Sequence, residues 1–267
     1  KVSLIGSKET GAKVRVAAAA GFKPVSMELG GKNPFIACAD ADTNILAHYA
    51  IDGMNFGWAG QSCCSTSRVF LHEDIHDEVL EKMVVKANAI QPSSPFNMDC
   101  QMGSLVSEQH YEKVKRYIEY GHQQGATLAC GGVHPGTSET KDGFFLRPTI
   151  FSNVTDDMTI AREEIFGPVM SVLKWKDPDE VVERANCLPY GLSASIWSNN
   201  ITDAHRMAQG VDSGYMWINA PAKHHMGNPF GGLKRSGVGK FACFSDVESF
   251  TEEKNINVGL GFARSCE

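Results

Sequence analysis

Long hydrophobic runs, an excess of basic residues and a signal peptide are all missing from this chain of 267 residues. No uncharged apolar stretch reaches the roughly 20 residues that a membrane-spanning helix needs. The 25 Lys and Arg residues are outnumbered by 31 Asp and Glu residues, which leaves a formal charge of −6. This balance argues against a protein that binds the phosphate backbone of nucleic acids. We therefore expect neither a membrane nor a nucleic acid as a partner.

Cysteine is sparse, and its spacing excludes two further classes of protein. The eight cysteines are too few for a disulfide scaffold, and none of their spacings is typical of a zinc site. We therefore expect a reduced, intracellular protein, in the cytoplasm or alternatively an organelle matrix, with no metal site and with one thiol used in chemistry. The cysteines are Cys38, Cys63, Cys64, Cys100, Cys130, Cys187, Cys243 and Cys266.

The chain also has no internal repeat and no low-complexity tract, and its first residue is Lys1 rather than Met. Residues 2–5 already have the pattern of a buried strand, although no earlier strand is available to pair with them. We therefore expect a piece of a longer protein that is cut inside a domain.

What the sequence does contain is a regular alternation of strand and helix patterns, which predicts an α/β fold with a mostly parallel sheet and helices on both faces. Strands are expected at Val2–Ile5, Pro24–Leu29, Ser67–His72, Ala126–Ala129, Phe144–Ile150, Val169–Trp175, Ser193–Trp197 and Tyr215–Ile218, with an edge strand at Thr251–Val258. Helices are expected at Lys8–Ala20, Asp42–Trp58, Ile75–Ile90, Ser107–Gln124, Pro178–Asn186 and Thr202–Gly210. Pro92–Pro95 and Gly131–Gly143 are expected to be loops.

Two motifs follow the first two expected strands. The sequence GSKETG, from Gly6 to Gly11, joins a strand to a helix, and such a turn either holds a phosphate or is an ordinary connection. In MELGGKNP, Glu28 ends an apolar strand, at the place where open α/β sheets bind ligands. Partial burial there raises a carboxyl pKa toward the range useful for a general base, but a surface Glu beside a turn fits equally well.

Three further groups of residues carry potential chemistry. Cys63 and Cys64 lie among small residues in GQSCCSTS, which suits either an accessible nucleophile or two buried small side chains. The carboxylates of EEIFGPV, from Glu163 to Val169, suit ribose hydroxyls or solvent. His224 and His225 suggest a metal ligand or a base, although most such pairs are ordinary loop residues.

The order and spacing of five motifs resemble those of the aldehyde dehydrogenase superfamily, and the resemblance runs from Lys1 to about Val258. The motifs are GSKETG, MELGGKNP, GQSC, EEIFGPV and NPFGGLKRSG. The resemblance implies a C-terminal portion that lacks most of the cofactor-binding domain. Residues 1–30 would be the remnant of the dinucleotide-binding domain, and residues 31–236 the catalytic domain. Residues 237–267 would return and supply a strand to a neighbouring subunit, as in a homodimer or homotetramer.

The resemblance also implies a role for each matching residue. Cys63 would be the nucleophile that forms a thiohemiacetal and then a thioester with a small aldehyde, and Glu28 the general base that activates water. NAD or NADP would be the cofactor. The residues implied to bind it are Gly6, Ser7, Gly11, Leu29, Glu164 and Phe166, and those implied to bind substrate are Ser62, Asn219 and Phe230.

The departures from the family limit these expectations. The Asn of the family's oxyanion hole and the residues that hold the adenosine ribose would precede Lys1, so this chain alone is expected to be nearly inactive. The polar loop Pro221–Asn228 suggests a polar or amino-substituted aldehyde, betaine aldehyde included. Two rival hypotheses are a non-redox thiol hydrolase, which needs a His near Cys63, and a structural protein that inherited the fold.

Overall fold

The computed structural model describes residues 1–134, 136–137, 140–221 and 223–259. Two sheets organise the chain, with strand orders β1-β2-β10 and β5-β6-β7-β4-β3-β8-β9. The strands are β1 Val2–Gly6, β2 Val25–Leu29, β3 Pro34–Ala37, β4 Arg68–His72, β5 Thr127–Val133, β6 Leu146–Ser152, β7 Val169–Trp175, β8 Ser193–Trp197, β9 Tyr215–Ile218 and β10 Gly237–Val238. The helices are α1 Lys8–Ala19, α2 Thr43–Gly53, α3 His76–Ala89, α4 Glu108–Gln123, α5 Thr159–Arg162, α6 Pro178–Asn186, α7 Ile201–Gly210 and α8 Phe244–Glu248, with short 3₁₀ turns η1 Phe56–Trp58 and η2 Lys234–Ser236.

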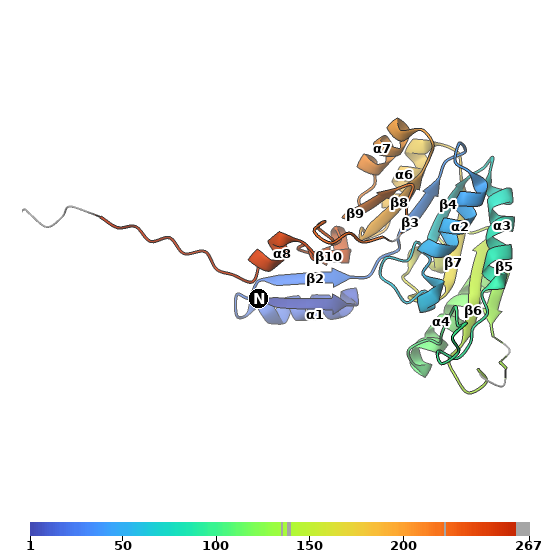
Figure 1. The fold of residues 1–267 in the computed structure, drawn as a ribbon, viewed down its shortest axis with the longest axis horizontal. Helices are drawn as coiled ribbons and strands as arrows, with labels where there is room; N and C mark the ends of the chain where they lie inside the picture. Colours follow the sequence, from blue (N-terminus) through green and yellow to red (C-terminus); the bar gives the residue numbers. More distant parts are fainter. Residues whose placement is uncertain (135, 138–139, 222, 260–267) are drawn as a thin grey trace, which may run out of the picture.

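The larger sheet is parallel except for β5, which runs antiparallel to β6. The β3–α2–β4 and β7–α6–β8 connections step in opposite directions along this sheet. Right-handed crossovers in opposite directions place their helices on opposite faces. Accordingly, α2 and α3 cover one face, and α6 and α7 cover the other (Figure 1). The predicted α/β class, with a mostly parallel sheet and helices on both faces, is confirmed.

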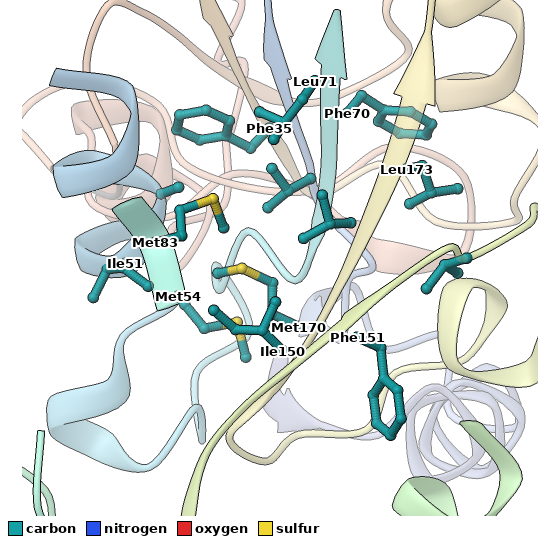
Figure 2. Packing of buried hydrophobic residues seen from close by; sticks show 14 of the residues in the cluster. Phe35, Ile51, Met54, Phe70, Leu71, Met83, Ile150, Phe151, Met170 and Leu173 are labelled. Carbon is teal, nitrogen blue, oxygen red and sulfur yellow. The ribbon is translucent and has the colours of Figure 1, made fainter. Parts of the chain in front are cut away.

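The main hydrophobic core lies on the two faces of this larger sheet. Strands β3 and β8 are buried at every position, as expected for parallel strands that are covered on both sides. In Figure 2, side chains from the strands, such as Phe35 and Met170, pack with Met54 and Met83 from the side of the helices. Methionine suits this junction because its flexible chain fills irregular gaps.

Local sequence signals explain most of the element boundaries. Ser107 caps α4 by accepting a hydrogen bond from the His110 N–H, as its position predicts. Asp177 caps α6 in the same way, and Pro178 occupies the first turn. The predicted bounds of β7, α6, β8 and β9 are confirmed to the residue.

Two predicted segments need correction, and strand β3 has to be added to the predicted set. Strand β3 was not predicted, because its four residues directly follow the turn-like GGKN sequence. The helix expected to reach Trp58 ends at Gly53, and the left-handed backbone of Asn55 precedes η1. Strand β5 extends into the loop that was expected from Gly131. Thr251–Val258 pairs with no strand within the described chain, where these exposed residues run away from the body of the molecule (Figure 1), and the pairing expected with a neighbouring subunit stays a prediction.

Strand β5 is irregular as well as antiparallel. Its register with β6 shifts between Leu128 and Cys130 and again between Cys130 and Gly132. Gly131 and Gly132 have φ of +91° and +90°, which side chains with a Cβ rarely adopt. These shifts are β-bulges on an outermost strand of the sheet.

The smaller sheet is thinly covered. Helix α1 packs beside β1 and β2 but buries only Gly11 and Ala18. The predicted division at residues 30 and 236 stays a prediction, and residues 260–267, Cys266 among them, lie outside the described residues. The seven cysteines of the described part are all unpaired. In that part, no helix is long and apolar enough to cross a membrane, and no cluster of His, Cys, Asp and Glu suits a metal ion.

Candidate active site

The predicted site residues gather where the two sheets meet. The carboxyl end of β2 lies here beside the loops that lead into β4 and β7, so segments far apart in the sequence share one cleft of about 490 Å³. Most of the predicted site residues line it: Gly6, Ser7, Glu28, Leu29, Ser62, Cys63, Glu164 and Phe166. The cleft is completed by Ile5, Gly30, Trp58, Gln61, His110 and Lys113, which were not predicted.

The cysteine loop reaches the cleft between η1 and β4. Its path depends on Gly60, which has φ of +66° and where a Cβ would lie 2.3 Å from the Gly167 carbonyl oxygen. Cys63 is half-buried and lines the cleft, whereas Cys64 is buried in a small cluster with Leu192 and Trp217. The structure therefore places Cys63, rather than Cys64, where a bound molecule meets it.

Glu28 faces the same cleft from the end of β2. Glu28 is only 4% exposed, and its Oε1 atom has no hydrogen-bond partner among the described residues. Burial raises the pKa of this carboxyl, although a hydrogen bond with the Cys63 thiol opposes the shift. The sequence-based hypothesis of a partly buried carboxyl with a raised pKa agrees with this geometry, and a purely surface Glu does not.

The two thiols interact with each other. Their sulfur atoms are 3.7 Å apart. The hydrogen bond with Cys64, burial and the nearby Glu28 carboxylate all raise the pKa of Cys63. The hydrogen bond from Cys63 and the nearby His224 ring lower the pKa of Cys64 to about 6. A thiolate formed on Cys64 is therefore one proton transfer away from a thiolate on Cys63.

His224 is the functional neighbour that sequence reasoning did not place. Its ring packs against Tyr215, Trp217 and Phe230, with centroid distances of 5.5, 5.8 and 4.6 Å. The Trp217 indole N–H donates to the Lys223 carbonyl and fixes the loop just before it. Interaction with the Cys64 thiol raises the pKa of His224. The only sequence signal was a histidine pair in a loop, 160 residues after the cysteines.

Glu164 and Phe166 form the wall of the cleft that suits a ribose and an aromatic ring. Glu164 Oε1 accepts a hydrogen bond from the Gly31 N–H at 3.0 Å, and burial raises the pKa of this carboxyl. A Cβ on Gly30 would lie 1.8 Å from Glu164 Oε2, so glycine is required for this approach. Phe166 has a left-handed backbone and leaves 39% of its surface exposed. A half-buried carboxylate and an open phenyl face beside Cys63 fit a nicotinamide riboside group.

Comparisons with known proteins agree with this arrangement of residues. The model of the aldehyde dehydrogenase family matches residues 1–256. The chain belongs to the aldehyde dehydrogenase family. It spans about half the length of the curated relatives it matches.

Three relatives illustrate this similarity. Aldehyde dehydrogenase tropH of Talaromyces stipitatus is 46% identical over 98% of this chain and 52% of its own length. Betaine aldehyde dehydrogenase of Rhizobium leguminosarum is 44% identical over 98% of this chain and 53% of its own length. The NAD⁺ complex of the aldehyde dehydrogenase from Bacillus cereus is 40% identical, covers 94% of this chain and 50% of that one, and superposes with a TM-score of 0.90.

Within this aldehyde dehydrogenase chain, three predicted site residues do not line the cleft. Gly11 lies in α1, where a Cβ would lie 2.8 Å from the Leu29 side chain, so its glycine allows close packing of helix on strand. Asn219 is exposed and uses its side chain in hydrogen bonds to the Ser198 backbone. Phe230 packs against the cluster of Cys64 and Trp217, behind the nucleophile.

Ser7 lines the cleft but is also committed locally. Its side chain accepts a hydrogen bond from the Thr10 N–H and caps α1. The helix therefore begins at the cleft, and the free N–H groups of a helix N-terminus favour anions. The predicted diphosphate contact of Gly6 and Ser7 is compatible with this position and stays a prediction.

Proposed function

We propose that the protein carrying this chain oxidises an aldehyde to a carboxylic acid, with NAD or NADP as the hydride acceptor. The observation that carries this proposal is the convergence of Cys63, Glu28 and Glu164 on one cleft from three separate segments. Membership of the aldehyde dehydrogenase family and the NAD⁺ complex of the Bacillus cereus relative support it. The cofactor would lie along Glu164 and Phe166, with its diphosphate toward Gly6 and Ser7.

The reaction divides into two steps at Cys63. The Cys63 sulfur, as a thiolate, bonds to the aldehyde carbon while the carbonyl π electrons move to the oxygen, which gives the oxyanion form of a thiohemiacetal; this oxyanion re-forms the C=O bond as hydride leaves. The cofactor, when bound, supplies the acceptor for the hydride that leaves this carbon, and a thioester on Cys63 remains. Glu28 takes a proton from a water molecule, which attacks the thioester. The carbon–sulfur bond then breaks, so that a carboxylic acid and free Cys63 are produced.

The environment of Glu28 suits this second step. A carboxyl with a raised pKa is a stronger base, and the unpartnered Oε1 is free to accept a proton from water. Because the ionised form is the base, hydrolysis requires a pH above the raised pKa of Glu28. Its hydrogen bond with the Cys63 thiol also places it to take the thiol proton before substrate attack.

The test uses the full-length protein, NAD⁺ and acetaldehyde or betaine aldehyde. We expect NADH absorbance to rise, and acid-quenched samples to carry the acyl group on the peptide that contains Cys63. An acyl group on another cysteine would overturn the assignment of the nucleophile. Release of acid without NADH would overturn the assignment of the reaction.

A second candidate function, cofactor-independent thiol hydrolysis, is favoured by one observation. His224 packs on Trp217, which clusters with Cys64, and His224 and Cys64 shift each other's pKa, so a thiol–imidazole pair lies next to Cys63. This function predicts ester cleavage without NAD⁺ that is lost in a His224→Ala variant. Ester cleavage that depends on Cys63 and survives this substitution would favour the dehydrogenase.

We propose a class of aldehyde as the substrate and a homo-oligomer as the assembly. The polar loop with Lys223, His224 and His225 and the relatives named betaine aldehyde dehydrogenase support a polar or amino-substituted aldehyde. The exposed, extended residues 251–259 support a homodimer or homotetramer in which they pair with a neighbouring subunit. Light scattering on the full-length protein, with and without these residues, tests the assembly.

A further inference from the structure

Asn33 ties the nucleophile loop to another part of the larger sheet. It is only 2% exposed, and its carboxamide is fully engaged. The Nδ2 group donates to the Cys63 carbonyl oxygen at 2.7 Å and to the Ser65 carbonyl oxygen at 3.0 Å. Its Oδ1 accepts from the Ser193 N–H at 3.1 Å. One side chain therefore brackets the cysteine loop and anchors it to the start of β8.

Ser236 connects the segment that follows Glu28, the proposed general base, to the residues before β8. Its side chain is completely buried. The Ser236 hydroxyl donates to the Gly30 carbonyl oxygen at 2.7 Å and accepts from the Gly191 N–H at 3.0 Å. Gly30 lies two residues after Glu28, and Gly191 lies two residues before Ser193.

These two connections meet on the same short segment, Gly191–Ser193, which leads into β8. This segment is buried, and a Cβ on Gly191 would lie 2.5 Å from the Asp212 carbonyl oxygen, so it has little room to shift. Glu28 belongs to the smaller sheet and Cys63 to a loop of the larger one. Strand pairing within one sheet therefore does not set their separation, and the hydrogen bonds of Asn33 and Ser236 connect the two segments through Gly191–Ser193.

We propose that Asn33 and Ser236 are positioning residues, which hold Cys63 and Glu28 at the separation that catalysis needs by fixing both to Gly191–Ser193. Neither side chain lines the cleft, so each acts through the backbone it holds. This role rests on the proposed function of Cys63 and Glu28. A clamp of this kind matters because a misplacement of about 1 Å can slow a reaction about 10²-fold.

The variants are Asn33→Ser, Ser236→Ala and their combination. Asn186→Ser is the matched control, because Asn186 makes the same kind of clamp, donating to the Gly210 carbonyl and accepting from the Asp212 N–H, both at 2.7 Å. Circular dichroism checks that each variant folds. Alkylation at several pH values, with peptide mapping, then follows Cys63 and Cys64 separately and needs neither cofactor nor turnover.

We expect both single variants to shift the pH midpoint of Cys63 alkylation down toward that of an ordinary thiol, because the contacts with Cys64 and Glu28 loosen. In the full-length enzyme, kcat should fall about ten- to a hundredfold while KM for the aldehyde changes little. The combined variant should lose little more than either single variant, because both break one constraint. Asn186→Ser should leave the alkylation profile unchanged.

Two results would overturn the proposal. One is a folded Asn33→Ser or Ser236→Ala variant whose alkylation profile and kcat match those of the unsubstituted protein. The other is an equal shift caused by Asn186→Ser, which would show general loosening. If the alkylation shifts appear while the unsubstituted enzyme shows turnover with neither NAD⁺ nor NADP⁺, the proposed function fails and the coupling of the two segments stands.

Discussion

The two sheets of this chain are covered to very different degrees. In the larger sheet, β3 and β8 are buried at every position, and helices cover both faces. In the smaller sheet, β1 is largely exposed, and α1 leaves Val16 75% exposed. The larger sheet therefore carries its own core, whereas the smaller one offers surfaces that nothing in the described chain covers.

The proposed catalytic and cofactor-binding residues are divided between these two sheets. The larger sheet holds Cys63 and Glu164 on loops with a packed foundation, and the smaller sheet holds Glu28 and the first turn of α1. The side of the cleft that contains the Cys63 thiol thus rests on a more fully packed sheet than the side that would bind the cofactor diphosphate. The Ser236 hydrogen bonds connect the two sheets through Gly30 and Gly191, and the Asn33 hydrogen bonds hold the cysteine loop to the nearby Ser193.

The largest expected effect concerns the nucleophile on the well-supported side. Cys63→Ala should lower aldehyde oxidation by about 10⁴-fold or more, because the covalent route is lost. Cys64→Ala should keep acyl-enzyme formation, because Cys64 does not line the cleft. NADH formation and peptide mapping measure both. A Cys64→Ala variant that is as inactive as Cys63→Ala would show that the buried thiol is essential.

The second effect concerns Glu28 on the thinly covered side. Glu28→Gln should slow thioester hydrolysis by about 10²–10⁴-fold, so that an acyl-enzyme accumulates. Hydrolysis in the unsubstituted enzyme should increase with pH through the raised pKa of Glu28, because only the ionised carboxylate is the base. Rapid-quench kinetics across pH measure this. An unchanged pH profile in Glu28→Gln would assign the base elsewhere.

The third effect compares the stability of the two sheets directly. Phe70→Ala, at a fully buried position in β4, should cost about 3–5 kcal/mol of the free energy of unfolding. Val16→Ala, on the exposed face of α1, should change it by no more than about 0.5 kcal/mol. Urea denaturation measures both. Equal losses would mean that the smaller sheet is packed in solution against another part of the protein.

The fourth effect concerns the pH dependence of stability. Lys32 is buried, its Nζ has no partner among the described residues, and burial together with Arg68 lowers its pKa from 10.5 to about 7. Between these values the unfolded chain binds the extra proton, so this group makes stability increase with pH from about 7 to 10.5. Lys32→Met should flatten that slope in urea titrations. An unchanged slope would mean that Lys32 is charged in the folded protein.

The sequence predicted elements best where one strong local signal dominates. The apolar run of β7 and the Asp-Pro start of α6 were assigned to the residue. Strand β3 was missed because Pro34 and the preceding GGKN sequence have the character of a turn, and only pairing with β4 and β8 makes it a strand. Tertiary context overrode local propensity there.

For the site, the sequence identified residues but not their partners. Glu28, Cys63 and Glu164 were predicted from motifs, and the structure brings them to one cleft. Asn33 and His224 act across 30 residues or more, and their contacts with the cysteine loop depend on the folded topology. Gly11 was assigned to cofactor binding because a glycine in a turn motif serves phosphate contact and tight packing equally well.

The bulges in β5 have a consequence for how the larger sheet meets other chains. A regular edge strand can pair with a strand of another chain, and natural proteins often disrupt such edges to avoid aggregation. The two register shifts around Cys130 break the ladder at one end, whereas β9 pairs with β8 in regular register at the other. We therefore expect strand addition to this sheet to be one-sided, at the regular edge strand β9 and not at the irregular edge strand β5.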